Sequence, residues 1–159
     1  MPFSSAAARV LVTFACALAL PVAAQAAVGQ SVAVPKQSAA ATIEQCVTSV
    51  SQAERSATFV GEMTATPATA HMQMRIEVLE KLPKEATFHT VLAPGLGVWR
   101  VAAAGVKVYK YLKQVTNLSA PAVYRGAVHF RWLNAKGRQI RSLELRTPRC
   151  EEPAPPQGS

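Results

Sequence analysis

The regular alternation of apolar and polar residues is the feature that most constrains how this chain can fold. From His71 to Val78, the even positions carry Met, Met, Ile and Val, and the odd positions carry His, Gln, Arg and Glu. Successive side chains of a strand point to opposite faces, so this pattern predicts a strand with one buried face. Shorter versions of the pattern occur over 56–63, 86–92, 97–102, 106–116, 123–133 and 138–147. We therefore expect about seven strands, a number typical of β-sandwich domains.

Turn-forming residues separate the expected strands. They lie at 66–67, 82–83, 94–97, 104–105, 120–121 and 134–137, and each of these sites contains Pro or Gly. The intervals leave no room for the helices that connect parallel strands, and short strands at this spacing are typical of antiparallel sandwiches and barrels. The 159 residues suit a single domain. We expect an all-β fold, namely an antiparallel β-sandwich.

A local motif near residue 120 makes this expectation more specific. Tyr124 follows Leu118 by six residues, with Pro121 between them, at the start of an alternating range. The motif resembles the tyrosine corner of immunoglobulin-like and fibronectin type III domains, in which the Tyr hydroxyl bonds to the backbone a few residues upstream. The resemblance implies a sandwich of that type with a Trp in its core, a role open to Trp99 and Trp132. The mature chain also resembles a group of small secreted bacterial proteins, and this second resemblance implies no activity.

The first 26 residues have the composition of a secretory signal peptide. Arg9 precedes an apolar stretch over 10–20, Pro21 ends that stretch, and residues 24–26 (Ala-Gln-Ala) match the small-residue pattern before a cleavage site. The stretch is shorter than the about 20 residues that a membrane-spanning helix needs. We expect cleavage after this tripeptide, no transmembrane segment in the mature chain, and a secreted or extracytoplasmic location in the cell envelope or periplasm.

Two cysteines remain after cleavage, Cys46 and Cys150, and an oxidising compartment favours a disulfide between them. The bridge closes a loop of about 100 residues, for which the chain-entropy model gives roughly 4 to 5 kcal/mol. It ties the start of the domain to its end, unlike the immunoglobulin disulfide, which crosses the core. A redox or metal site is the alternative, although neither cysteine belongs to a C-x-x-C motif.

The two ends of the mature chain lack a sustained hydrophobic period. Residues 27–43 are mostly small and polar, and residues 151–159 combine Pro, Gly and charged residues. We therefore expect a flexible N-terminal segment over 27–43, a folded domain over 44–150 and a disordered tail over 151–159. At the start of the domain, residues 42–50 fit either a short helix with a capping box or an extended segment.

Positive charge is concentrated in the C-terminal half of the expected domain. Between Arg100 and Arg149 there are eleven Lys and Arg residues and one acidic residue, Glu144. If the apolar residues of 123–133 face the core, the basic residues between them face outward, and a hairpin brings the arginines of 138–147 beside them. Together with the Trp of the preceding loop, the expected contact residues are Arg125, His129, Arg131, Arg138, Arg141, Arg146 and Trp99.

Neighbouring guanidinium groups bind carboxylates and phosphates well. The basic face therefore predicts contact with an anionic envelope polymer, a lipid head group or an acidic protein, whereas export argues against nucleic acid. The alternative is a solvated face that only aids solubility. Trp99 also has two interpretations, because a Trp at the end of the 94–98 loop either binds a partner or belongs to the core.

Few residues of the chain suit catalysis or metal binding. All nine acidic residues are Glu, which excludes mechanisms that need Asp, and the usual nucleophile and phosphate-binding motifs are missing. Copper or zinc ligands are offered by His71, His89, His129, Met63, Met72 and Met74. However, His71 and Met74 differ in parity and so face opposite sides of their strand. We expect no metal, no cofactor and no enzymatic activity.

These observations favour an exported, non-catalytic binding or adhesion-like module. Its basic face, formed by 123–133 and 138–147, contacts an anionic envelope component or an acidic protein. One alternative is a structural or accessory envelope protein that pairs with a partner strand through a sheet edge. The other is a small exported protein that binds copper or zinc.

Overall fold

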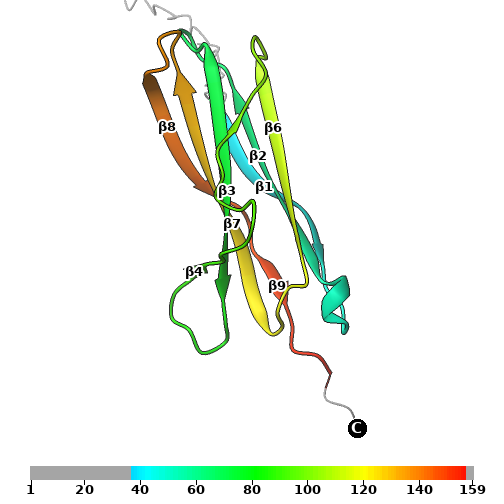
Figure 1. Ribbon diagram of the computed structural model, residues 1–159. Helices are drawn as coiled ribbons and strands as arrows, with labels where there is room; N and C mark the ends of the chain where they lie inside the picture. Colours follow the sequence, from blue (N-terminus) through cyan, green and yellow to red (C-terminus); the bar gives the residue numbers. More distant parts are fainter. Residues whose placement is uncertain (1–36, 157–159) are drawn as a thin grey trace, which may run out of the picture. The chain divides into compact units, whose positions relative to one another are not determined.

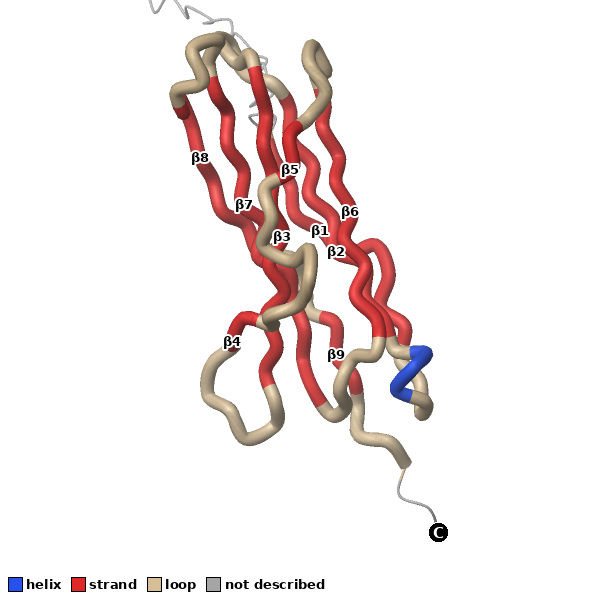
Figure 2. The backbone as a smooth tube through the Cα atoms, viewed as in Figure 1, coloured by secondary structure: helices blue, strands red, loops and turns tan. Residues whose placement is uncertain are grey.

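A computed structural model describes residues 37–156, which form two antiparallel β-sheets (Figure 1, Figure 2). The expected all-β antiparallel sandwich is confirmed. A short 3₁₀ turn covers Gln52–Glu54. The strands are β1 (Ala39–Val47), β2 (Ser56–Thr64), β3 (His71–Lys81), β4 (His89–Thr90), β5 (Arg100–Val101), β6 (Val108–Thr116), β7 (Ala122–Leu133), β8 (Gln139–Arg146) and β9 (Cys150–Glu152).

The chain crosses repeatedly between the two sheets. One sheet has the order β1-β2-β6, and the other has the order β4-β3-β7-β8, with β5 paired to β3 and β9 paired to β7. Figure 1 shows β3, β7 and β8 side by side, with β1, β2 and β6 forming the second group. Within residues 37–156, no helix is long and apolar enough to cross a membrane.

The core lies between the inner faces of the two sheets. On β3, the residues Met72, Met74, Ile76 and Val78 are buried, as the alternation predicts. Burying a side chain of this size stabilises the fold by about 1.5 to 3 kcal/mol relative to leaving it exposed. The facing buried side chains of β2 and β7 are Ala57, Phe59, Met63, Tyr124, Val128, Phe130 and Trp132.

Trp132 is the core tryptophan. Its side chain is fully buried, and its Nε1–H donates a hydrogen bond of 2.8 Å to the carbonyl oxygen of Thr64. Trp132 lies on β7 and Thr64 on β2, so this bond joins the two sheets. A buried indole N–H needs such a partner. Trp99, the other candidate for this role, lies outside the core.

The inner faces approach each other closely at Gly61 on β2. A Cβ atom at this position would lie 2.3 Å from the Sδ atom of Met74 and 2.7 Å from a Cγ atom of Val128. Both distances are far below van der Waals contact, so only glycine fits here without moving its neighbours. The absent side chain lets β2 pack directly against β3 and β7.

The ends of the domain differ from the expected boundaries. The first strand begins at Ala39, so the flexible segment expected over 27–43 is wrong for its last five residues. For residues 42–50, where a short helix and an extended segment were both open, the structure shows extended chain through Val47. At the other end, β9 includes Glu151 and Glu152, which were expected to belong to the tail. Both segments are short and lack clear alternation, but pairing with β2 and β7 supplies the backbone hydrogen bonds that order them. The expected signal peptide and residues 27–36 lie outside the described residues.

The disulfide between Cys46 and Cys150 joins β1 of one sheet to β9 of the other. The Cα atoms lie 5.6 Å apart, and the two residues are separated by 104 positions in sequence. The bridge therefore ties the two ends of the domain together, as expected, and does not link β2 to β7 through the middle of the core.

Candidate functional site

The basic residues of β7 follow the predicted alternation. Tyr124, Val128 and Phe130 are buried in the core, whereas the odd-numbered Arg125 and Arg131 are partly exposed. His129 shares their parity, so all three basic side chains lie on the face of this sheet that points away from β1, β2 and β6. We call this the outer face. It is formed mainly by β3, β7 and β8.

Trp99 lies on the outer face beside the arginines. Its neighbour Arg100 pairs with Met74, which places Trp99 next to Arg75 across the β5–β3 ladder. The guanidinium carbon of Arg131 lies 3.8 Å from the centre of the Trp99 ring, and that of Arg75 lies 5.1 Å from it. A cation over an aromatic face is attracted by its quadrupole. Trp99 therefore extends over β3 towards β7 and holds two guanidinium groups in place.

A hollow of about 480 Å³ opens beside this pair of arginines. We call it the Trp99 groove. Its floor and walls come from β3, β7 and β8 and from Trp99, which directly precedes β5. The lining residues are Arg75, Trp99, His129, Phe130, Arg131, Gln139, Ser142, Leu143 and Glu144.

Two carboxylates also reach into this basic surface. Glu77 lies 3.1 Å from Arg75, and Glu144 lies 3.2 Å from Arg146. Between them, Nε2 of His129 is 3.4 Å from Glu77, and Nδ1 is 3.7 Å from Glu144. The Nε2 contact has the distance of an ion pair without the alignment of a hydrogen bond, since Nε2 is buried with no hydrogen-bond partner. The odd position of Glu77 in the alternation from His71 to Val78 is the sequence signal that places its side chain on the outer face.

Three of the expected contact residues do not belong to the groove. Arg141 pairs with Trp132 across the β7–β8 ladder, so its side chain is on the core side of the sheet, 4.9 Å from the Trp132 ring. The expectation that Arg141 lies beside Arg131 is therefore wrong. The reason is the pairing register, in which Ser142 lies opposite Arg131. Arg138 precedes β8 in the turn, and Arg146 pairs with Ala127, farther along the sheet.

Arg125 also lies away from the groove. Its guanidinium group donates a hydrogen bond of 3.2 Å to the carbonyl oxygen of Thr147 and lies 5.7 Å from the Phe88 ring. Burial lowers the pKa of this group, and the positive charges of Arg146 and Arg149 lower it further. The expected basic face is thus divided into separate parts, and only His129, Arg131 and Trp99 of the predicted set meet in one hollow.

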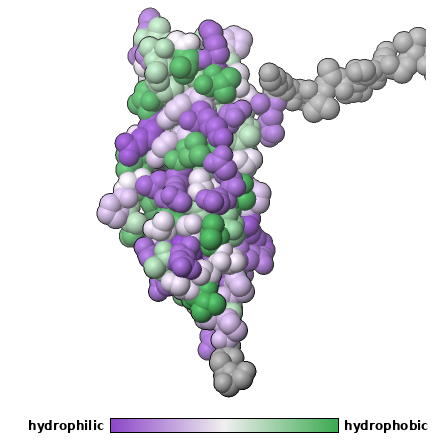
Figure 3. Space-filling model, turned by 90° about the vertical axis from the view of Figure 1, so that its right-hand side faces the viewer, coloured by the Kyte–Doolittle hydropathy of each residue, from purple (hydrophilic) through white to green (hydrophobic). Residues whose placement is uncertain are grey.

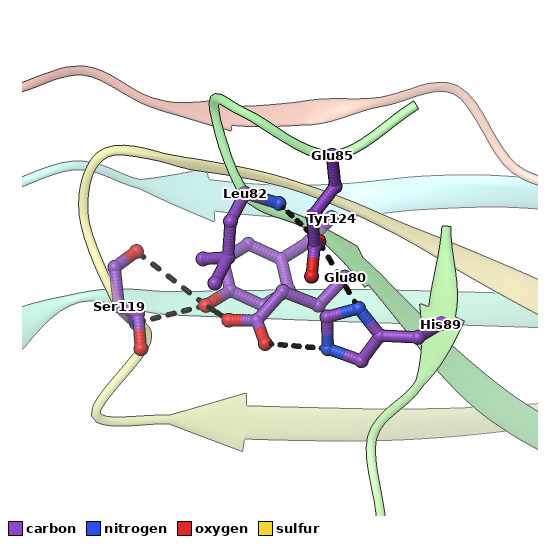
Figure 4. Close-up of polar contacts among 6 residues, drawn as sticks. All are labelled: Glu80, Leu82, Glu85, His89, Ser119 and Tyr124. Atoms are coloured by element: carbon purple, nitrogen blue, oxygen red, sulfur yellow. Dashed lines mark hydrogen bonds and ion pairs between the residues drawn. The ribbon is translucent and has the colours of Figure 1, made fainter. Parts of the chain in front are cut away.

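A second polar cluster lies at the corner before β7 (Figure 4). The hydroxyl of Tyr124 accepts a hydrogen bond of 2.8 Å from the backbone N–H of Ser119 and donates one to the carboxylate of Glu80. The predicted hydrogen bond of the tyrosine corner is therefore confirmed. Burial raises the pKa of Tyr124 to about 12, and the hydrogen bond to Glu80 raises it as well.

This cluster continues from Glu80 to the loop before β4. Nε2 of His89 lies 3.1 Å from Glu80, and Nδ1 lies 3.2 Å from Glu85, which also accepts a hydrogen bond of 2.8 Å from the backbone N–H of Leu82. Figure 4 shows His89 between the two carboxylates. Both ring nitrogens of His89 face carboxylate oxygens, and these contacts hold the loop over 82–90 in place. No sequence pattern linked Tyr124 to residues more than 30 positions away.

The histidines and methionines of the metal hypothesis are distributed along the sheet. His129 pairs with Arg75 and His89 pairs with Glu80, so the three imidazoles lie level with positions 71, 75 and 80 of β3. At about 3.3 Å per residue, neighbouring imidazoles are roughly 13 and 16 Å apart along the strand. The three methionines, Met63, Met72 and Met74, are buried in the core. The described residues therefore do not bring these side chains together around one ion.

Comparisons with known proteins do not assign this chain to a family. No protein-family model matches the chain, and no curated protein matches it. Among solved structures, the chain is similar to a crystal structure from Bordetella pertussis assigned as the ApaA protein, with 15% sequence identity and a TM-score of 0.36. That match covers 76% of this chain and 93% of the other. At this TM-score the similarity supports neither a family nor a function.

Proposed function

We propose that this chain is an exported, non-catalytic binding module of the immunoglobulin-like or fibronectin type III-like kind, and that its Trp99 groove contacts an anionic component of the cell envelope. The leader pattern over 1–26 supports export, and a disulfide suits an oxidising compartment. The strand order supports the domain type, because β1-β2-β6 and β8-β7-β3 correspond to strands A-B-E and G-F-C of the immunoglobulin arrangement.

The observation that carries the proposal is the contact between Arg131 and Trp99. A guanidinium group 3.8 Å from an indole centre has a restricted orientation, so little side-chain entropy is lost when it binds an anion. Arg131 borders an open hollow, which leaves its N–H groups accessible to a ligand. A planar guanidinium group is well suited to a carboxylate or a phosphate.

The contacts of His129 support a binding role over a catalytic one. Both ring nitrogens face carboxylates, those of Glu77 and Glu144. A general base must instead present a nitrogen to the group from which it takes a proton. In this arrangement His129 lies between the two carboxylates, of which Glu144 lines the groove.

The proposal is tested by measuring the binding of the exported, oxidised protein to a panel of anionic envelope polymers and anionic lipid vesicles at two salt concentrations. Arg131→Gln and Trp99→Ala are each expected to weaken binding at least tenfold. Arg149→Gln is the matched control, because it removes one exposed arginine outside the groove and is expected to change binding by less than twofold.

Equal losses in Arg131→Gln and Arg149→Gln would show that only net charge matters, and they would overturn the proposal of a site. Absence of binding to every member of the panel would overturn it as well. Circular dichroism of each variant establishes that the sandwich is intact, so that a folding defect is not taken for a lost contact.

Pairing through a sheet edge is a second candidate, and the surface of β6 favours it. Val108 is 53% exposed and Leu112 is 43% exposed on this edge strand of the three-stranded sheet. Figure 3 shows hydrophobic residues interspersed with hydrophilic ones on the visible face. Co-purification of a partner that survives high salt and is lost in Leu112→Lys would favour this function. Loss of the same partner in high salt would exclude it.

A further inference from the structure

The charge balance of the Trp99 groove leaves one arginine uncompensated. Arg75 is paired with Glu77, and Arg146 is paired with Glu144. Among residues 37–156, no carboxylate lies within ion-pair distance of Arg131, whose positive charge contacts only the Trp99 ring. The groove therefore offers one free cation, which is complementary to one anionic group of a ligand.

The carboxylates at the groove make it unsuited to a ligand with closely spaced negative charges. Glu144 lines the hollow, and Glu77 contacts two of its lining residues, Arg75 and His129. A polyphosphate or a sulfated polymer that places one charge on Arg131 brings its next charges close to these carboxylates, and like charges repel. A ligand whose charges are widely spaced along the chain avoids this repulsion.

The remaining polar groups of the groove together offer both donors and acceptors of hydrogen bonds. Gln139 supplies an amide and Ser142 a hydroxyl, and each has donor and acceptor atoms, whereas Glu144 only accepts. Phosphate oxygens only accept hydrogen bonds, so they cannot donate one to the carboxylate of Glu144. The hydroxyl groups of a sugar donate as well as accept, so they match this set of groups.

Trp99 adds an apolar wall to the same hollow. The guanidinium group of Arg131 lies over this ring, so the indole offers its remaining surface to the C–H groups of a partly apolar ligand. A volume of about 480 Å³ lies within the usual range of small-ligand sites and suits a short segment of a polymer. Shape and chemistry thus select a ring-shaped, hydroxylated ligand with a single acidic group.

We infer that the ligand of the Trp99 groove is a uronic acid residue of an acidic polysaccharide, with its carboxylate on Arg131, its hydroxyl groups on Gln139, Ser142 and Glu144, and its ring against Trp99. This inference rests on the proposed function and specifies its ligand. It also predicts that Glu144 selects against polyphosphate.

Nuclear magnetic resonance of the exported, oxidised, ¹⁵N-labelled protein provides the test. The probes are a disaccharide that contains one glucuronic acid, the same disaccharide with its carboxyl group reduced to an alcohol, and inorganic polyphosphate. The indole Nε1–H signals of the two tryptophans give an internal control. The signal of Trp99 is expected to shift with the acidic disaccharide, while that of Trp132, bonded to Thr64 in the core, stays in place.

Variants separate the individual contacts. Arg131→Gln is expected to weaken binding of the acidic disaccharide at least tenfold, and carboxyl reduction is expected to have a similar effect on the unmodified protein. Glu144→Gln is expected to weaken disaccharide binding and to strengthen polyphosphate binding several-fold. Arg149→Gln again serves as the matched control.

The outcomes distinguish this inference from the function on which it rests. Binding of polyphosphate, with loss in Arg131→Gln and no response to the acidic disaccharide, would overturn the uronic acid ligand and leave an anion-binding groove. Equal binding of the acidic and reduced disaccharides would also overturn it. No shift of Trp99 with any probe would count against both the ligand and the groove.

Discussion

The hydroxyl oxygen of Tyr124 lies 2.8 Å from the backbone nitrogen of Ser119, and this hydrogen bond closes the corner between β6 and β7. The same hydroxyl donates to Glu80, whose side chain is only 16% exposed. Tyr124→Phe leaves both groups without this partner. We expect the free energy of unfolding to fall by about 1 to 3 kcal/mol, as measured by urea denaturation of the oxidised protein.

Tyr111→Phe is the matched control for this corner. Tyr111 is half-buried on β6, away from Ser119 and Glu80, so its replacement is expected to change stability by less than about 0.5 kcal/mol. A loss as large in Tyr111→Phe as in Tyr124→Phe would mean that general packing, and not the corner hydrogen bonds, accounts for the effect.

The raised pKa of Tyr124 predicts a loss of stability in alkali. Its pKa is about 12 in the folded protein against 10.0 for an ordinary tyrosine, because burial and the hydrogen bond to Glu80 disfavour the phenolate. The contribution of the protonated Tyr124 to the free energy of unfolding is complete below pH 10 and is lost as the pH rises towards 12. Urea denaturation at several pH values should show a smaller alkaline loss in Tyr124→Phe than in the unmodified protein. Parallel losses in the two proteins would contradict this assignment.

Glu152 predicts a substitution that stabilises the protein. Its side chain is 2% exposed, Oε2 has no hydrogen-bond partner among the described residues, and burial raises the pKa of the carboxyl group although Arg55 opposes this shift. Because the pKa of Glu152 is higher in the folded state, the contribution of this group to the free energy of unfolding is complete at acid pH and is lost as the carboxyl group ionises. Glu152→Gln should therefore raise the urea midpoint at pH 7 and have little effect at pH 4.

The exposed neighbour Glu151 provides the control for this prediction. Glu151→Gln removes the same charge from the same strand without relieving burial, so its urea midpoint should stay close to that of the unmodified protein at both pH values. A stabilisation equal to that of Glu152→Gln would instead indicate a general effect of net charge.

Removal of the disulfide should destabilise the domain strongly. The bridge links positions 104 residues apart, and loss of such a bridge from a small domain typically reduces stability by about 2 to 5 kcal/mol. The Cys46→Ser/Cys150→Ser double variant is expected to show this loss in urea denaturation, and reduction of the unmodified protein should produce a similar change. An unchanged midpoint after verified reduction would show that β9 remains in place without the covalent link.

Much of the fold follows from local patterns in the sequence. The alternation from His71 to Val78 placed one strand and its buried face correctly, because the period of two is a property of the strand itself. The hydrogen bond between the Tyr124 hydroxyl and the backbone of Ser119 was likewise predicted from a short motif. The strand β1 was missed in part, because Ala39 and its neighbours are too small and uniform to show a period, and pairing with β2 determines their conformation.

The candidate site was only partly accessible from the sequence. Parity on one strand is enough to place Arg125, His129 and Arg131 on the same face. The relation of Arg141 to that face depends on register, since a shift of one residue reverses the face to which a side chain points. The register of β7 and β8 shifts near Trp132 and sets Arg141 on the other side.

The sequence by itself determined an all-β chain and most of its strands and turns, because these depend on residue type and short-range spacing. The pairing of Cys46 with Cys150 was predicted from the cysteine count and not from spacing, and the structure confirms it. The tertiary structure alone decided that Trp99 lies over Arg131, that Glu77 and Glu144 flank His129, and that Trp132 fills the core. The physical reason is that these contacts join strands distant in sequence, and their geometry is set by sheet order and register.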